Sequence, residues 1–135
     1  MSAITGVDHI ALTVSHLDQS AAWYEAVFGL VRIATAEEGG GARHKVILRH
    51  PGTGLRIGLV THRSSPPEPF DETHMGLDHV SFSVASREEL EAMQQRLEQR
   101  GAPQSPLAEG LGGALVLVFR DPDNIQLELV FRPTS

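Results

Sequence analysis

The chain has no cysteine among its 135 residues, which excludes disulfides, thiol nucleophiles and cysteine-ligated metal sites. It is also poor in bases, with 11 Lys and Arg against 17 Asp and Glu and a net charge of −6. The bases are scattered, so no basic stripe marks a nucleic-acid surface. The longest apolar run is the six residues 114–119, far below the roughly 20 of a membrane span. The N-terminus lacks the basic start of a secretory leader, so we expect a soluble, cytoplasmic globular protein.

An internal repeat is the first positive feature of the sequence. Residues 7–14 read VDHIALTV, and residues 77–84 repeat the pattern as LDHVSFSV at an offset of 70. Each copy alternates apolar with small or polar residues, which is typical of a half-buried strand. In the first copy Ile10, Leu12 and Val14 would face a core, whereas His9 and its alternate neighbours would face the other way.

A helix is predicted after each copy of the repeat. The first would be capped by Asp18 and end at Gly29, and the second would open with a Ser86–Glu89 capping box and end at Gly101. Apolar stripes at helical spacing support both predictions. The stripes are Leu17, Ala21, Tyr24, Val27 and Phe28 in the first helix and Leu90, Met93 and Leu97 in the second.

Three strand-like segments follow each helix, so the chain reads βαβββ twice. A proline-rich joint at about residues 63–75 separates a first module, about 5–62, from a second, about 76–132. We expect an α+β protein, one domain over residues 1–135, whose curved mixed sheets surround a cleft. The expected strands are Val31–Glu37, His44–Arg49, Leu55–Thr61, Ala102–Ala108, Gly113–Arg120 and Ile125–Phe131.

Strand alternation places three potential metal ligands on the face away from the core. They are His9, His79 and Glu128, and the repeat matches His9 with His79 and Glu128 with Gly58. Two imidazoles and one carboxylate suit a divalent transition metal, and the missing fourth ligand leaves room for substrate. A lone histidine or glutamate of this kind is more often a solvated side chain. The equivalence of the two histidines is what favours a metal site.

Four further residues are expected to line the cleft. Arg56 and Arg120 have the facing needed to anchor an anionic substrate, although an arginine at a strand edge also commonly extends into solvent. Val116 and Val118 face the same way and indicate a substrate with a hydrophobic part. No residue is indicated as a general base, so the catalytic residues stay unassigned.

These motifs together resemble the vicinal oxygen chelate superfamily. The resemblance rests on the two Asp-His strands and on Asp-Pro-Asp-Asn at 121–124 followed by Glu128, and it runs from about Thr5 to Arg132. That superfamily includes glyoxalase I, extradiol dioxygenases, methylmalonyl-CoA epimerase, fosfomycin-modifying thiol transferases and bleomycin resistance proteins. The resemblance implies the glyoxalase/bleomycin resistance/dioxygenase fold. It also implies a divalent metal, Fe(II), Mn(II), Ni(II) or Zn(II), at His9, His79 and Glu128.

The chain departs from each named activity at a specific residue. Gly58 stands where glyoxalase I and the epimerase carry a fourth ligand, and Ala11 stands where fosfomycin enzymes carry threonine. The further histidine and tyrosine of extradiol dioxygenases have no assignable counterpart. The leading hypothesis is a metal-dependent enzyme, with lyase, isomerase or dioxygenase chemistry left open, acting on a small molecule that chelates through vicinal oxygens. The alternative is a metal-free protein that binds a small molecule or antibiotic, as bleomycin resistance proteins do.

Short members of the superfamily pair two chains, and each site takes ligands from both. The resemblance therefore implies a homodimer in which His9 of one chain meets His79 and Glu128 of the other.

Overall fold

The computed structural model describes residues 3–66 and 68–133. The chain divides into two compact units, residues 1–67 and 68–135, and each unit is described by itself. The boundary lies inside the proline-rich segment 63–75. Among the described residues, neither helix has the length and apolar character required to cross a membrane.

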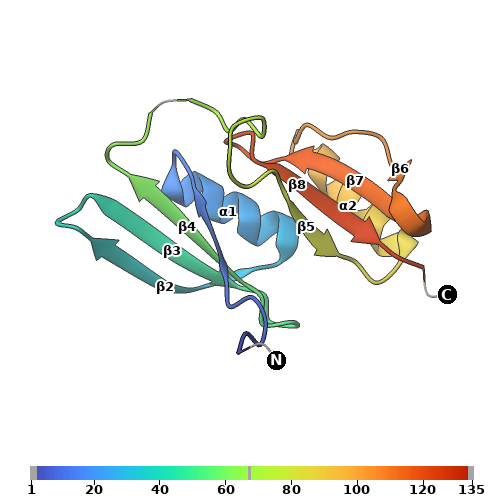
Figure 1. Ribbon diagram of the computed structural model, residues 1–135, viewed down its shortest axis with the longest axis horizontal. Coiled ribbons are helices and arrows are strands. Elements are labelled where there is room, and N and C mark those ends of the chain that lie inside the picture. Colours follow the sequence, from blue (N-terminus) through green and yellow to red (C-terminus); the bar gives the residue numbers. More distant parts are fainter. Residues whose placement is uncertain (1–2, 67, 134–135) are drawn as a thin grey trace. The chain divides into compact units, whose positions relative to one another are not determined.

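The first unit is a four-stranded sheet with one helix packed against it (Figure 1). The strands run in the order β1-β4-β3-β2, with β1 parallel to β4 and the other neighbours antiparallel. Helix α1 contacts β3 and β4, the two central strands. The elements are β1 (Ile10–Thr13), α1 (Leu17–Phe28), β2 (Val31–Glu38), β3 (Arg43–Arg49) and β4 (Arg56–His62).

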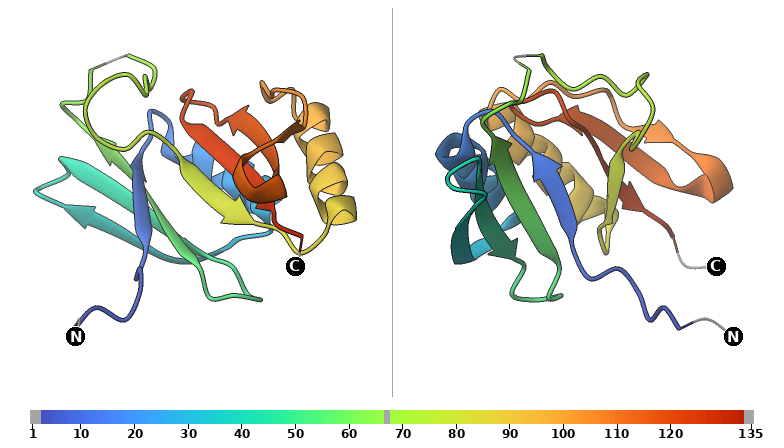
Figure 2. Two further views of the ribbon diagram at one scale, coloured as in Figure 1. Left: turned by 45° about the vertical axis from the view of Figure 1, so that its right-hand side comes forward. Right: turned by 60° about the vertical axis from the view of Figure 1, so that its left-hand side comes forward.

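The second unit repeats this topology, with the strand order β5-β8-β7-β6 and a parallel β5–β8 pair. Helix α2 contacts β7 and β8, and Figure 2 shows it lying along one face of that sheet. The elements are β5 (Val80–Ser83), α2 (Arg87–Gln99), β6 (Ala108–Glu109), a 3₁₀ turn (Leu111–Gly113), β7 (Leu115–Arg120) and β8 (Gln126–Phe131). The α+β prediction with two βαβββ modules is confirmed.

The strand registers define which residues of the two units are equivalent. Ala11 lies opposite Gly58 in the first unit, and Ser81 lies opposite Glu128 in the second, in agreement with the offset of 70. The offset becomes 71 between β3 and β7, because Arg49 pairs with Arg56 whereas Arg120 pairs with Gln126. The turn between the last two strands is therefore one residue longer in the first unit.

Each core lies between a helix and the apolar face of its sheet, as the alternation predicts. Leu127 and Leu129 on β8 are buried, whereas Glu128 between them is only partly buried. Tyr24, on the α1 stripe, is fully buried. Val130, whose position in the alternation assigns it to the opposite face, is also buried.

The helix ends are set by local chemistry, and one prediction about them is wrong. Ser86 Oγ accepts a hydrogen bond of 3.1 Å from the backbone N–H of Glu89, and Gly29 ends α1 in the left-handed conformation at φ 68°. The N-cap of α1 is His16, however, and Asp18 lies inside the first turn. Its carboxylate accepts a hydrogen bond from Arg32 at 3.3 Å, so it does not cap the helix.

The predicted strand Ala102–Ala108 is largely absent. Only Ala108–Glu109 forms a strand, with an isolated bridge between Gln104 and Phe119. Two prolines, at 103 and 106, lack the N–H that a sheet ladder requires. The segment nevertheless follows β7, since Ser105 N–H donates to Val118 O and the Pro103 carbonyl accepts from Arg120 N–H, both at 2.9 Å.

Candidate functional site

Each unit holds a histidine directly before its first strand, and the aspartate before that histidine binds its ring. The His9 Nδ1 to Asp8 Oδ2 distance is 2.7 Å, and the His79 Nδ1 to Asp78 Oδ1 distance is 2.6 Å. Because a carboxylate only accepts, Nδ1 is the protonated nitrogen in both rings, which leaves Nε2 available to bind a ligand. The hydrogen bond to His9 also holds the pKa of Asp8 below its usual 3.8, with smaller contributions from the charges of His9 and Arg56.

The second unit brings His79 together with Glu128. His79 Nε2 lies 3.5 Å from Glu128 Oε1, and Ser81, opposite Glu128 in the register, donates its hydroxyl to the same oxygen at 2.7 Å. Two donors that share one metal ion, each about 2.1 Å from it, are separated by about 3 Å or slightly more. The pair therefore fits the separation expected of two metal ligands. The Glu128 side chain is 19% exposed and remains accessible.

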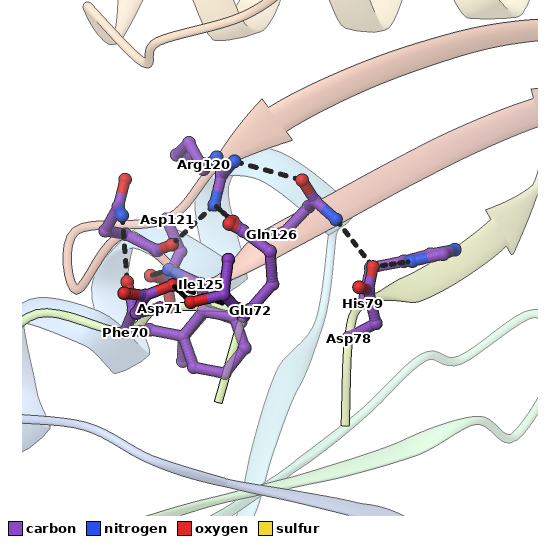
Figure 3. Close-up of polar contacts among 11 residues, drawn as sticks. Phe70, Asp71, Glu72, Asp78, His79, Arg120, Asp121, Ile125 and Gln126 are labelled. Atoms are coloured by element: carbon purple, nitrogen blue, oxygen red, sulfur yellow. Dashed lines mark hydrogen bonds and ion pairs between the residues drawn. The ribbon is translucent and has the colours of Figure 1, made fainter. Parts of the chain in front are cut away.

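A chain of hydrogen bonds supports His79 from β8 and β7 (Figure 3). Gln126 Nε2 donates to Asp78 Oδ1 at 2.9 Å, the oxygen that also accepts from His79. Arg120 Nη2 in turn donates to Gln126 Oε1 at 3.0 Å. Arg120 Nη1 forms a 2.6 Å ion pair with Glu72, so the charge of Arg120 is compensated inside the second unit.

The turn at 121–124 joins this network to the segment before β5. The buried Asp121 carboxylate accepts backbone N–H bonds of 2.8 Å from Asp123 and Ile125. Asn124 Nδ2 donates to the Phe70 carbonyl, and Phe70 N–H donates to the Asp123 carbonyl, each at 2.9 Å. Figure 3 shows Phe70, Asp71 and Glu72 gathered at this turn. The Asp-Pro-Asp-Asn motif thus positions Glu72 for Arg120.

The equivalent place in the first unit contains no carboxylate. Ala11 and Gly58 stand where the second unit has Ser81 and Glu128. A side chain at Gly58 would meet Ile47 Cδ1 at 3.4 Å, so the surroundings of this position are apolar. The ring of His9, whose side chain is 55% exposed, binds Asp8 of the same unit.

The other residues expected at the cleft lie on β4 and β7. Arg56, the first residue of β4, is exposed, whereas Arg120 ends β7 and is partly buried by its contacts with Glu72. Val116 and Val118 are half-buried on β7, and Val118 lies directly opposite Glu128 in the register.

A hollow of about 350 Å³ lies away from these residues, at the start of α1 in the first unit. The arginine and the lysine of its lining are already paired, since Arg32 binds Asp18 and Lys45 binds Glu38. We therefore do not include it in the candidate site.

Across residues 3–66 and 68–133, no group of three or more potential metal-ligating side chains is found together. The structure places His79 with Glu128, and it places His9 in the first unit with Asp8. Sequence reasoning missed the supporting roles of Ser81 and Gln126. The repeated Asp-His dipeptide was a usable signal for Asp8 and Asp78, whereas the partners of Ser81 and Gln126 depend on strand register.

Comparisons with known proteins identify the family. The model of the Glyoxalase/Bleomycin resistance protein/Dioxygenase superfamily matches residues 6–129. A glyoxylase/bleomycin resistance protein/dioxygenase domain from Frankia sp. EAN1pec is 37% identical, over 97% of this chain and 100% of that chain, with a TM-score of 0.88. No curated protein matches the chain.

Two more distant structures share the fold. A glyoxalase family protein from Enterococcus faecalis is 23% identical over 93% of this chain and 97% of that chain, with a TM-score of 0.77. The fosfomycin resistance protein FosX from Listeria monocytogenes, a mutant complexed with Mn(II) and 1S,2S-dihydroxypropylphosphonic acid, is 22% identical over 93% and 91%, with a TM-score of 0.69. The family match and the Frankia likeness each cover nearly the whole chain, and the chain therefore belongs to the glyoxalase/bleomycin resistance protein/dioxygenase superfamily.

Proposed function

We propose that the protein is a metal-dependent enzyme that acts on a small molecule chelating the metal through two neighbouring oxygens. The observation that carries this proposal is the His79–Glu128 pair, whose nitrogen and oxygen lie 3.5 Å apart. Each member is fixed by a separate partner, His79 by Asp78 and Glu128 by Ser81. Such outer partners orient metal ligands and raise their affinity for the ion.

His79 and Glu128 would hold the ion, and His9 is the proposed third ligand. A divalent metal bound there supplies Lewis-acid chemistry, which stabilises negative charge on a substrate oxygen. Fe(II), Mn(II), Ni(II) and Zn(II) all suit imidazole and carboxylate ligands. FosX of Listeria binds Mn(II), so Mn(II) is the first ion to test here.

The third ligand is proposed to come from a second copy of the chain. The first unit offers one histidine with its aspartate, and the second offers a histidine with a glutamate. A homodimer would then contain two equivalent sites, each with His9 of one copy and His79 and Glu128 of the other. Metal binding would stabilise such a dimer.

The other residues of the proposed site have distinct roles. Gly58 adds no fourth ligand and leaves space for substrate, and Val116 and Val118 offer apolar contact to its hydrophobic part. Arg120, which was predicted to line the cleft, is bound to Glu72 and Gln126, and we propose that it supports the site through these contacts. Whether the reaction is that of a lyase, an isomerase or a dioxygenase depends on the substrate.

Metal content measured by inductively coupled plasma mass spectrometry tests the proposal. Wild type, reconstituted with each of the four ions and desalted, should retain about one ion per chain, as a specific site requires. Glu128→Ala should lose the ion. The matched control Glu109→Ala, which removes an exposed carboxylate from β6, should keep it.

Absence of metal from the wild type after reconstitution would overturn the proposal. The alternative function, binding of a small molecule or antibiotic without metal, would then be tested by thermal-shift measurements with bleomycin. If the protein does bind metal, sedimentation of wild type and Glu128→Ala, each with and without the ion, measures whether metal binding stabilises the dimer.

A further inference from the structure

Two arginines face each other at the end of the β3–β4 hairpin. Arg49 ends β3, Arg56 begins β4, and the register pairs them directly. Directly opposed residues of an antiparallel pair project from the same face of the sheet. The next pair on that face is Ile47 with Gly58, so Gly58 adds no side chain beside Arg56. Arg56 is exposed and Arg49 is half-buried.

Neither guanidinium is held by a hydrogen bond or an ion pair among the described residues. No hydrogen bond or ion pair joins Arg49 or Arg56 to another group in residues 3–66 and 68–133. Arg56 is close enough to Asp8 to contribute to the lowered pKa of that carboxyl, but the carboxylate is hydrogen-bonded to His9. Like charges placed opposite each other on a sheet are destabilising. Two guanidinium charges against the single nearby carboxylate of Asp8 leave a net positive charge beside His9.

In the second unit, the arginine at the equivalent end of the hairpin has its charge compensated within the unit. There Arg120 lies opposite Gln126, a neutral side chain whose oxygen accepts from the arginine at 3.0 Å. Glu72 compensates the charge of Arg120 at 2.6 Å. The first unit has a cation in place of the amide and no counterpart of Glu72. Its two arginines lack the internal compensation that Arg120 has.

We propose that Arg49 and Arg56 form a subsite for an oxyanion, a phosphate, phosphonate or carboxylate group of the ligand. Two planar guanidinium groups offer several N–H donors, and an anion between them would remove their mutual repulsion. This inference rests on the proposed function, in which the other half of the ligand chelates a metal that has His9 among its ligands. The anionic half binds through residues of the first unit alone.

Inorganic phosphate binding to the metal-free protein tests the subsite. After treatment with a chelator, the wild type is titrated with phosphate at constant ionic strength, with ³¹P NMR and the thermal midpoint as readouts. Arg49→Gln and Arg56→Gln should each weaken phosphate binding about tenfold or more, as expected for loss of a charge-assisted hydrogen bond. Arg100→Gln, which removes an exposed arginine at the end of α2, should bind phosphate as the wild type does.

The variants also separate a binding role from a structural role. Without phosphate, Arg56→Gln should unfold at the wild-type temperature or higher, because the repulsion is relieved. An arginine that stabilises the fold would give a lower thermal midpoint. Phosphate binding equal in wild type and both variants, or no phosphate binding by the wild type, would overturn the inference.

A second titration connects the subsite to the metal. On the Mn(II)-loaded protein, glycolate presents two neighbouring oxygens, and L-malate presents the same pair plus a further carboxylate. Wild type should bind L-malate about tenfold more tightly than glycolate, and Arg56→Gln should lose this preference with its Mn(II) content unchanged. Failure to bind any of the four ions would refute the proposed function alone, whereas an unchanged preference in Arg56→Gln would refute the subsite alone.

Discussion

Removing the hydroxyl of Ser81 tests whether its hydrogen bond holds the Glu128 carboxylate in the orientation needed to bind a metal. Ser81 donates at 2.7 Å to Glu128 Oε1, the oxygen that lies 3.5 Å from His79 Nε2. Ser81→Ala removes this hydrogen bond and leaves the glutamate free to rotate away from the histidine. We expect weaker metal binding with little loss of fold stability.

The magnitude follows from the kind of hydrogen bond and from its exposure. A hydrogen bond to a charged acceptor contributes about 1.5–3 kcal/mol, and partial exposure of Glu128 places the effect at the lower end of that range. About 1.4 kcal/mol corresponds to a tenfold weaker affinity for Mn(II). Unfolding of the metal-free protein in urea should change by less than about 1 kcal/mol, because water can replace the hydroxyl at an accessible oxygen.

Isothermal titration of metal-free protein with Mn(II) measures the effect. Ser83→Ala is the matched control, since Ser83 lies two residues further along β5 with the same facing and is exposed. Ser81→Thr retains a hydroxyl in a strand that tolerates β-branching and should restore most of the affinity. Equal Mn(II) affinity in wild type and Ser81→Ala would refute the assigned role of the hydroxyl. So would equal losses in Ser81→Ala and Ser83→Ala.

Two further predictions concern the segment held by the turn at 121–124. The Thr73 hydroxyl and backbone N–H donate to Asp71 and hold its pKa below 3.8, so its charged form stabilises the fold above that value. The thermal midpoint of Asp71→Asn should therefore lie below that of wild type near pH 7, and the two should converge as the pH falls below 3.8; a constant difference would contradict this. Arg120→Gln removes the ion pair with Glu72 and should lower the free energy of unfolding by about 1 kcal/mol. It should also accelerate amide exchange at residues 70–74, and unchanged exchange there would contradict the assigned support role.

The elements that the sequence predicts well are those whose signals are local. Alternation locates the strands that bury Leu127 and Leu129, and the Ser86–Glu89 capping box marks the start of α2. Gly29 adopts the left-handed conformation that ends α1. Alternation fails at 102–108, where prolines interrupt a pattern that otherwise reads as a strand. The capping preference of aspartate also misplaces the cap of α1 at Asp18, since the N-cap is His16 and the Asp18 carboxylate binds a distant arginine, Arg32.

The same distinction applies to the candidate site, where features with a local signal are predicted from the sequence and features that depend on strand register are not. Strand facing alone predicts that His79 and Glu128 share a face, and the structure brings them within 3.5 Å. The pairing of Arg49 with Arg56 depends on register and on a turn that is one residue longer than its counterpart. A single repeat offset therefore aligns Arg120 with His50 instead of Arg49. The contact between Glu72 and Arg120 joins residues 48 positions apart, and no local pattern indicates it.

The duplicated register has a consequence for how this protein could diversify. Glu128 and Gly58 occupy equivalent places in two separate sheets, as do Gln126 and Arg56. Because each sheet has its own core and helix, we expect mutations in one unit to leave the backbone and hydrogen bonds of the other intact. Selection for a new ligand can act on β3 and β4 while β5, β7 and β8 keep the histidine and glutamate in place. Libraries randomised at Arg49, Arg56 and Gly58 are thus a direct route to altered specificity from this scaffold.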